Sequence, residues 1–220
     1  MKKMLTMLLA AAIALSTVTA CGGNEKNGGK KSNSVFDISK EAYEEIKNAY
    51  TITDKISGDV YEAWRAGIYD DDEMSVEFLD SETNLNEDEL VAGFNAFMNS
   101  TDKTKKDLDF IFSKYDDLDL SLPLWQLCVL IVTNAYEANG MAEEARVALE
   151  NAKTYMKTLS EKHSDYEHYP SLKGYYTTTN SYFNFCTNPE GSFEQIKTTI
   201  NDYRNDARDY VADIEFIFEE

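Results

Sequence analysis

The chain has few of the residues that characterise several large classes of protein. Its three cysteines in 220 residues are too few for a disulfide scaffold, and none shows the Cys-x-x-Cys spacing of a zinc site. Three prolines and ten glycines leave little to interrupt helices. Basic residues are scarce, 21 against 40 acidic ones, for a formal charge of −19. We therefore expect no nucleic-acid partner, because phosphate binding depends on clustered Lys and Arg.

Catalytic and metal-binding motifs are also missing. The sequence contains no G-x-S-x-G, no P-loop and no Gly-rich dinucleotide fingerprint. Its two histidines, His163 and His168, are five residues apart, whereas histidine ligands on one helical face need a spacing of three or four. Asp80 to Asp88 alternates like a calcium loop, but Leu85 and Val91 replace the required glycine and glutamate. We predict a non-enzymatic protein without a cofactor or metal.

The only long apolar run lies at the start of the chain. Lys2 and Lys3 precede a run from Met4 to Leu15 that is broken only by Thr6. A membrane-spanning helix needs about 20 apolar residues, so this run has the length of a secretory signal peptide instead. Residues 1–20 are therefore predicted to be a signal peptide.

Val18-Thr19-Ala20-Cys21 resembles the lipobox of bacterial lipoproteins. In that family a peptidase cleaves before the cysteine, whose thiol carries a diacylglycerol, so the resemblance implies lipidation of Cys21. Two acyl chains bind a bilayer stably, since each buried methylene contributes about 0.8 kcal/mol. The resemblance implies a protein anchored to the outer face of the cell membrane, similar to small uncharacterised helical lipoproteins of Gram-positive bacteria.

A flexible tether is predicted at residues 21–34. Gly22 to Ser34 contains four of the ten glycines, no apolar side chain and a net charge of +2. Residues 35–220 hold 16 basic and 39 acidic residues, a formal charge of −23, and are predicted to form a single domain. A basic tether beside anionic lipid and an acidic domain away from it would be an electrostatically favourable arrangement, although ordinary solubility explains the charges equally well.

Hydrophobic periodicity predicts an all-α domain. Apolar or small residues recur in alternating steps of four and three within residues 37–69, from Asn86 to Tyr115, and from Ser192 to the end of the chain. The acidic run Asp70–Glu73 separates the first two helices. A sustained period of 3.5 residues favours left-handed, coiled-coil-like packing, so we predict about five long helices joined as antiparallel hairpins. In the first helix the recurring positions are Ala42, Ile46, Ala49, Thr53, Ile56, Val60, Ala63 and Gly67.

Residues 122–157 resemble one tetratricopeptide (TPR) unit. Pro123 is typical of a helix start, Leu124 to Val132 is almost entirely apolar, and Asn139-Gly140 is typical of a turn between two helices. The positions that carry the resemblance are Tyr136, Gly140, Ala145, Leu149 and Ala152. The resemblance implies an antiparallel helical hairpin; an array of such units would need at least three.

An aromatic segment extends from Tyr155 to Cys186, with a turn predicted near residues 164–170 and a further helix to about residue 187. Its rings suit either a core or a partner surface, because tyrosine combines a large apolar area with a polar tip. Core packing is the favoured interpretation; if a partner surface exists here, we expect it at Tyr166, Tyr169, Tyr175 and Tyr176. Cys128 and Cys186 are predicted to be buried thiols, with a bridge between them as the alternative.

Three functions remain compatible with these features. The first is a membrane-anchored, non-enzymatic module that binds a protein or polymer at the cell envelope. The second is a phage-type superinfection-exclusion lipoprotein, which also combines a lipobox and a linker with a small helical domain. The third is a ligand-capture protein serving a transporter, although such proteins are usually larger and α/β.

Overall fold

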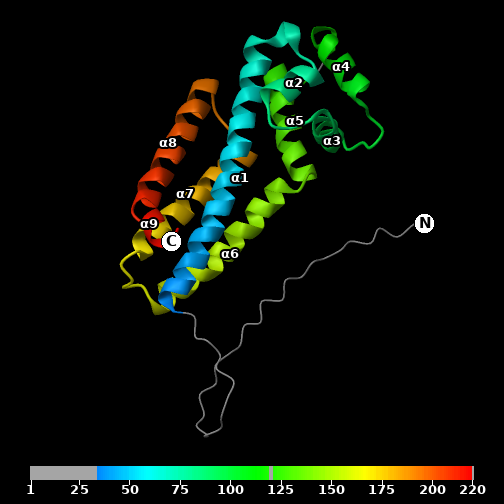
Figure 1. The fold of residues 1–220 in the computed structure, drawn as a ribbon. Helices are drawn as coiled ribbons and strands as arrows, with labels where there is room; N and C mark the ends of the chain where they lie inside the picture. The colour runs from blue at the N-terminus through cyan, green and yellow to red at the C-terminus, as the bar shows by residue number, and fades with distance from the viewer. Residues whose placement is uncertain (1–33, 119–120, 220) are drawn as a thin grey trace, which may run out of the picture. The chain divides into compact units, whose positions relative to one another are not determined.

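Helix α1 is the element along which the rest of the domain is assembled (Figure 1). The computed structural model describes residues 34–118 and 121–219, and within them it contains helices and turns but no strand. The predicted all-α class is therefore confirmed. Residues Asn33–Glu220 form one compact unit. The helices are α1 (Val35–Tyr69), α2 (Val76–Glu82), α3 (Glu87–Phe97), α4 (Lys105–Ser113), α5 (Leu124–Ala138), α6 (Met141–Lys162), α7 (Tyr169–Thr187), α8 (Phe193–Ala212) and α9 (Glu215–Phe218).

Local signals define both ends of α1. Ser34 and Asp37 form a capping box, in which each side chain accepts a hydrogen bond from the other residue's backbone N–H. The helix ends at Tyr69, directly before the acidic run that predicted its end. All eight positions of its four-three pattern are buried. The sequence alone therefore identified the face of α1 that contacts the other helices.

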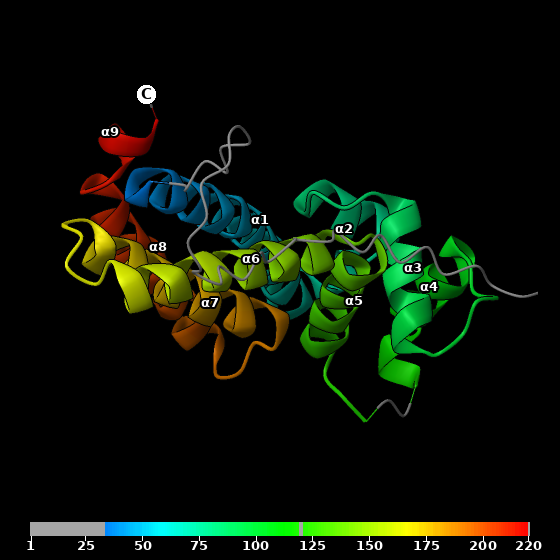
Figure 2. The ribbon, with the colours of Figure 1, turned by 90° about the horizontal axis from the view of Figure 1, so that it is seen from below.

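Two apolar clusters lie along α1. The first surrounds its C-terminal half and includes α3, α5 and the end of α7. The second surrounds its N-terminal half and includes α6, the start of α7 and α9. Helix α2 contacts α1, α3 packs mainly against α5, and α4 contacts α2 and α3. Figure 2 shows these three short helices at the opposite end of the domain from α9.

The prediction that residues 122–157 fold as an antiparallel hairpin is wrong. Gly140 takes the left-handed conformation (φ 87°) and separates α5 from α6, as Asn139-Gly140 predicted. However, both helices run along α1 instead of folding back on each other (Figure 1). Tyr136 near the end of α5 bonds Asp59, and Asn151 of α6 bonds Glu45. Both helices contact the 35-residue α1 far more extensively than they contact each other.

The helix predicted from Asn86 to Tyr115 is two helices. Asn99 adopts a left-handed conformation (φ 49°), and a Schellman motif ends α3: the Ser100 N–H donates to the Asn95 carbonyl and the Asn99 N–H to the Ala96 carbonyl. Thr104 and Asp107 then form a capping box that starts α4. Short polar residues here compete for backbone hydrogen bonds and so end the helix that the apolar spacing alone had extended.

Two further corrections concern short helices. No helix was predicted between the acidic run Asp70–Glu73 and Asn86, yet this stretch holds α2, which Ser75 caps and whose Val76 and Leu79 are buried. The helix predicted to reach the end of the chain breaks after Ala212, and α9 follows. This break allows Phe218 to pack against Tyr43, with ring centroids 5.4 Å apart. Among the described residues, no helix is long and apolar enough to span a membrane.

Candidate functional site

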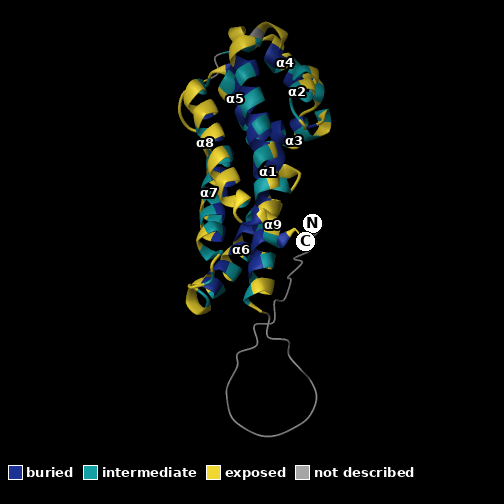
Figure 3. Ribbon diagram, turned by 60° about the vertical axis from the view of Figure 1, so that its left-hand side comes forward, coloured by how far each residue is buried: buried dark blue, intermediate teal, exposed yellow. Residues whose placement is uncertain are grey.

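Helix α8 is attached to the domain mainly through α7. The Tyr203 ring of α8 stacks on Tyr182 of α7, with centroids 5.2 Å apart. Tyr210 lies over Gly174, where an added Cβ would stand only 2.2 Å from the Tyr210 ring. Most of α8 is exposed (Figure 3), and its buried residues are Ile196, Ile200 and Ala207. Because α8 packs mainly against α7, an open space remains between α8 and α1.

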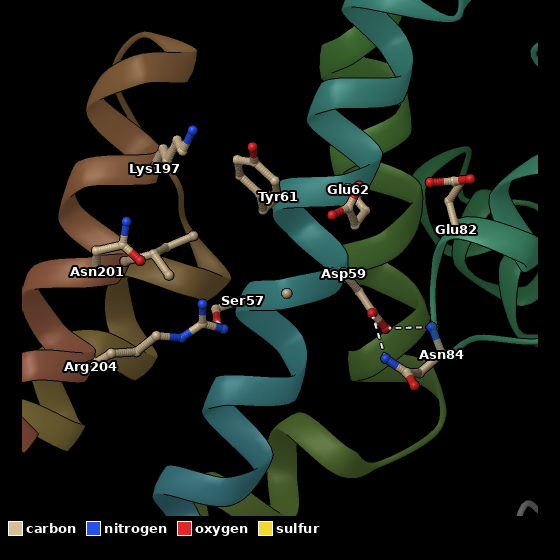
Figure 4. Close-up of a pocket in the computed structure, with 11 residues that line it drawn as sticks. Ser57, Asp59, Tyr61, Glu62, Glu82, Asn84, Lys197, Asn201 and Arg204 are labelled. Atoms are coloured by element: carbon tan, nitrogen blue, oxygen red, sulfur yellow. Dashed lines mark hydrogen bonds between the residues drawn. The ribbon is translucent and has the colours of Figure 1, made fainter. Parts of the chain in front are cut away.

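This space contains two cavities, which together we name the α1/α8 groove. Cavity A has a volume of about 420 Å³ and lies between α1, α8 and the chain that follows α2 (Figure 4). Cavity B has a volume of about 390 Å³ and lies between α1, α7, α8 and α9. The lining of cavity A includes Ser57, Tyr61, Asn84, Lys197 and Asn201. The lining of cavity B includes Tyr43, Tyr50, Tyr175, Arg208 and Glu215.

An ion pair between Asp54 and Arg204 borders both cavities, because Arg204 lines cavities A and B and Asp54 lines cavity B. The Arg204 Nε donates to Asp54 Oδ1 at 2.6 Å, and the Tyr182 hydroxyl donates to the same oxygen at 3.0 Å. The Ser57 hydroxyl donates to the backbone carbonyl of Asp54 at 2.8 Å and lies beside the Tyr182 hydroxyl. Among the described residues, this ion pair connects α8 directly to α1.

The protonation of this cluster follows from its surroundings. Burial raises the pKa of the Tyr182 hydroxyl well above its usual value, so the group stays protonated and can donate to Asp54. Burial alone would lower the pKa of Arg204, but its hydrogen bond to Asp54 and the nearby Tyr182 raise that pKa overall. Arg204 therefore remains a cation in the groove at neutral pH.

The far wall of cavity A is held by a buried carboxylate. Asp59 is 2% exposed and accepts hydrogen bonds from the Asn84 backbone N–H (2.9 Å), the Asn84 side-chain amide (2.8 Å) and the Tyr136 hydroxyl (2.5 Å). Burial raises the pKa of Tyr136, which keeps that donor protonated. Asp59 thus joins α1 to α5 and to the segment between α2 and α3, and its oxygens are already used.

Basic residues of α8 face the groove. Lys197, Arg204 and Arg208 line the cavities, whereas Asp202, Asp206 and Asp209 are exposed and line neither. Figure 4 shows the side chains of Lys197 and Arg204 extending from α8 toward α1. These three are the only basic residues of α8. Within a domain of formal charge −23, one helix therefore directs its cations inward to the groove and most of its anions outward.

The predicted partner tyrosines do not form an exposed surface. Tyr175 is buried, at 2% exposed, and its ring packs against Tyr50 and Tyr43, so it belongs to the floor of cavity B. Tyr166, Tyr169 and Tyr176 are half-buried. The favoured interpretation of the aromatic segment, core packing, agrees with this placement.

Cys128 and Cys186 are free and buried, as predicted. Burial raises the pKa of Cys128 to about 12 and raises that of Cys186 well above its usual value, so both thiols are protonated and unreactive. His163 and His168 are half-buried, and the described residues contain no group of three or more His, Cys, Asp or Glu side chains that could hold a metal ion. Cys21 lies outside the described residues.

No protein-family model, curated protein or solved structure matches this chain. Its function must therefore be inferred from its own residues. The α1/α8 groove was not found from the sequence, although one signal was present. Lys197, Asn201, Arg204 and Arg208 follow one another at spacings of four, three and four, which places them on one face of a helix.

Proposed function

We propose that this protein is a lipid-anchored lipoprotein on the outer face of a bacterial cell membrane. Its helical domain would bind another protein along the α1/α8 groove, without catalysing a reaction. The lipobox Val18-Thr19-Ala20-Cys21 supports the anchor and its location. The groove supports the binding function. The proposal depends on one observation: Lys197, Arg204 and Arg208 of α8 all line the groove.

The lining of the groove has the composition of a protein-binding surface. Each cavity falls within the range of ligand-binding pockets, which is about 300 to 1,000 Å³. Tyrosine and arginine are enriched at interface positions that contribute most to affinity, and the lining includes Tyr50, Tyr61, Arg204 and Arg208. A deep pocket with converging titratable groups, as in an enzyme, is not needed for such a role.

The anchor is tested by the substitution Cys21→Ala. This variant cannot receive a diacylglycerol, so we expect it to move from the membrane fraction to the soluble fraction, measured by fractionation and immunoblotting. Ser32→Ala, in the tether, is the matched control and should stay with the membrane. Retention of Cys21→Ala on membranes would contradict the anchor.

The groove is tested by photo-cross-linking in cells. A benzoylphenylalanine at Asn201, which lines cavity A, should give a discrete cross-linked product with a partner protein. The same probe at Lys157, an exposed position of α6 that lines neither cavity, is the control and should not give that product. Identical products from both positions, or none from Asn201, would contradict binding at the groove.

A further inference from the structure

We propose that cavity A binds a short peptide, about three residues long, through its free amino and carboxyl termini. This inference goes beyond the proposed function, because it concerns a small ligand and not a partner protein. It follows from the opposite charges on the two sides of the cavity, from the distance between those sides, and from a glycine in the floor.

One side of cavity A offers cationic donors. Lys197 and Asn201 of α8 are exposed, and neither side chain forms a bond with a described residue. Arg204 uses its Nε for Asp54 and, at 3.5 Å, one Nη for Ser57, which leaves its other Nη without a described partner. The Asp54 carboxylate balances the charge of Arg204, so Lys197 leaves this side positive. A carboxylate binds such donors more strongly than a neutral group does.

The other side of cavity A offers carboxylate acceptors. Glu62 of α1 and Glu82 at the end of α2 each bind the Arg65 guanidinium through one oxygen. The second oxygen of each carboxylate forms no bond with a described residue. Arg65 also binds Asp70 at 2.9 Å, and one guanidinium cannot balance the charge of three carboxylates. This side is therefore negative and can accept charge-assisted hydrogen bonds from an ammonium group.

The two sets of charges are separated by the width of α1. Figure 4 shows Lys197, Asn201 and Arg204 on one side of α1, and Glu82 and Asn84 on the other. A helix with its side chains is about 10 Å across. The two charged groups of a free amino acid share one Cα atom and cannot reach both sides, whereas an extended tripeptide is about 10 Å long. A ligand with charge of one sign would meet only one of the two sides.

The floor of cavity A includes a glycine in the interior of α1. Gly58 lines the cavity, and an added Cβ would meet no atom within 4 Å. Close helix packing therefore does not require glycine here, although glycine in a helix is about 1 kcal/mol less favourable than alanine. Without a side chain at this position, a ligand can lie directly against the backbone of α1.

The uncharged groups of the cavity match the middle of a peptide. The Asn84 side-chain amide donates to Asp59, which leaves its oxygen available to a peptide N–H, and Asn201 can bond a second peptide group. The half-buried Tyr61 ring stacks on Phe193, with centroids 5.1 Å apart, and offers a surface to a small apolar side chain. The volume of about 420 Å³ lies within the range of small-ligand pockets.

The test measures binding of tri-alanine to the full chain in detergent, by isothermal titration calorimetry. The comparison peptides are tri-alanine with an acetylated amino terminus and tri-alanine with an amidated carboxyl terminus, each of which lacks one charge. We expect tri-alanine to bind at least tenfold more tightly than either. No binding of tri-alanine, or equal binding of all three peptides, would overturn the proposal. Binding of the neutral disaccharide maltose as tightly as tri-alanine would also overturn it, because a sugar would then suffice.

Matched variants locate each terminus of the peptide. Lys197→Gln should reduce the preference for tri-alanine over the amidated peptide at least threefold and leave the preference over the acetylated peptide unchanged. Glu82→Gln should do the reverse. The controls Lys106→Gln and Glu144→Gln remove exposed charges that line neither cavity, and should change neither preference. A cavity variant that behaves like its control would overturn the proposal.

Gly58→Leu tests the floor of the cavity. It should weaken tri-alanine binding at least tenfold without lowering Tm, because leucine favours the helix and has room for its Cβ. Ser160→Leu, at an exposed position of α6, is the control and should change Kd less than twofold. Unchanged binding by Gly58→Leu would overturn the proposal, and the charge variants decide independently of its stability. Cross-linking at Asn201 does not require the peptide, so failure here leaves the proposed function intact.

Discussion

Replacing Asp59 with alanine should lower the free energy of unfolding by about 3 kcal/mol, because it leaves the buried Tyr136 hydroxyl without an acceptor and removes the two hydrogen bonds that hold Asn84 to α1. The Asp59 carboxylate is 2% exposed and accepts three hydrogen bonds, two from Asn84 and one from Tyr136. Removing it leaves the hydroxyl of Tyr136, a residue that is 1% exposed, without a hydrogen-bond partner. Denaturant unfolding followed by circular dichroism measures the effect.

Two controls distinguish this buried network from the general acidity of the domain. Tyr136→Phe removes one of the three donors and should lower the free energy of unfolding by only about 1 kcal/mol. Asp202→Ala removes an exposed carboxylate of α8 and should change it by less than about 0.5 kcal/mol. A loss from Asp59→Ala as small as that from Asp202→Ala would contradict the network.

Replacing Gly93 with alanine should lower the free energy of unfolding by about 3 kcal/mol, because α3 and α5 cross too closely for a methyl group. An added Cβ at Gly93 would stand 2.2 Å from the Ile131 carbonyl oxygen and 2.7 Å from the Ala135 nitrogen. Both are backbone atoms, which cannot move aside as a flexible side chain can. The two helices would have to separate and lose apolar contacts.

Gly58 provides the opposite expectation for the same substitution. It also lies within a helix, but an added Cβ there would meet no atom within 4 Å. Gly58→Ala should therefore raise the free energy of unfolding by about 0.5 to 1 kcal/mol through helix propensity alone. Thermal unfolding of Gly93→Ala and Gly58→Ala, measured side by side, compares their shifts in Tm. Equal shifts in Tm would contradict the close crossing of α3 and α5.

Local rules predicted much of the helical structure. Apolar periodicity identified the helices and the buried face of α1, because a helix in water must cover one apolar face. Capping residues placed several ends correctly, at Ser192 and at the Asn139-Gly140 turn. The same rules wrongly predicted continuous helices through residues 98–104 and 213–214. The apolar periodicity continues across each break, although the backbone changes direction there.

Packing between distant segments could not be predicted in this way. The sequence around Gly140 specifies a left-handed residue and hence a change of direction, but α1 decides where α5 and α6 lie. The partner tyrosines were chosen for their aromatic character. Their burial depends on α1 and α9, which are far away in the sequence.

The sequence by itself determined an acidic all-α domain, the buried face of its longest helix, and a lipobox that stays a prediction. It also placed Lys197, Arg204 and Arg208 on one face of a helix. Only the tertiary structure decided that this face borders a groove, because Arg204 bonds Asp54 across 150 residues of chain. Helical spacing is a local property, since each turn is fixed by neighbouring residues. A groove depends on two elements that meet only when the whole core packs.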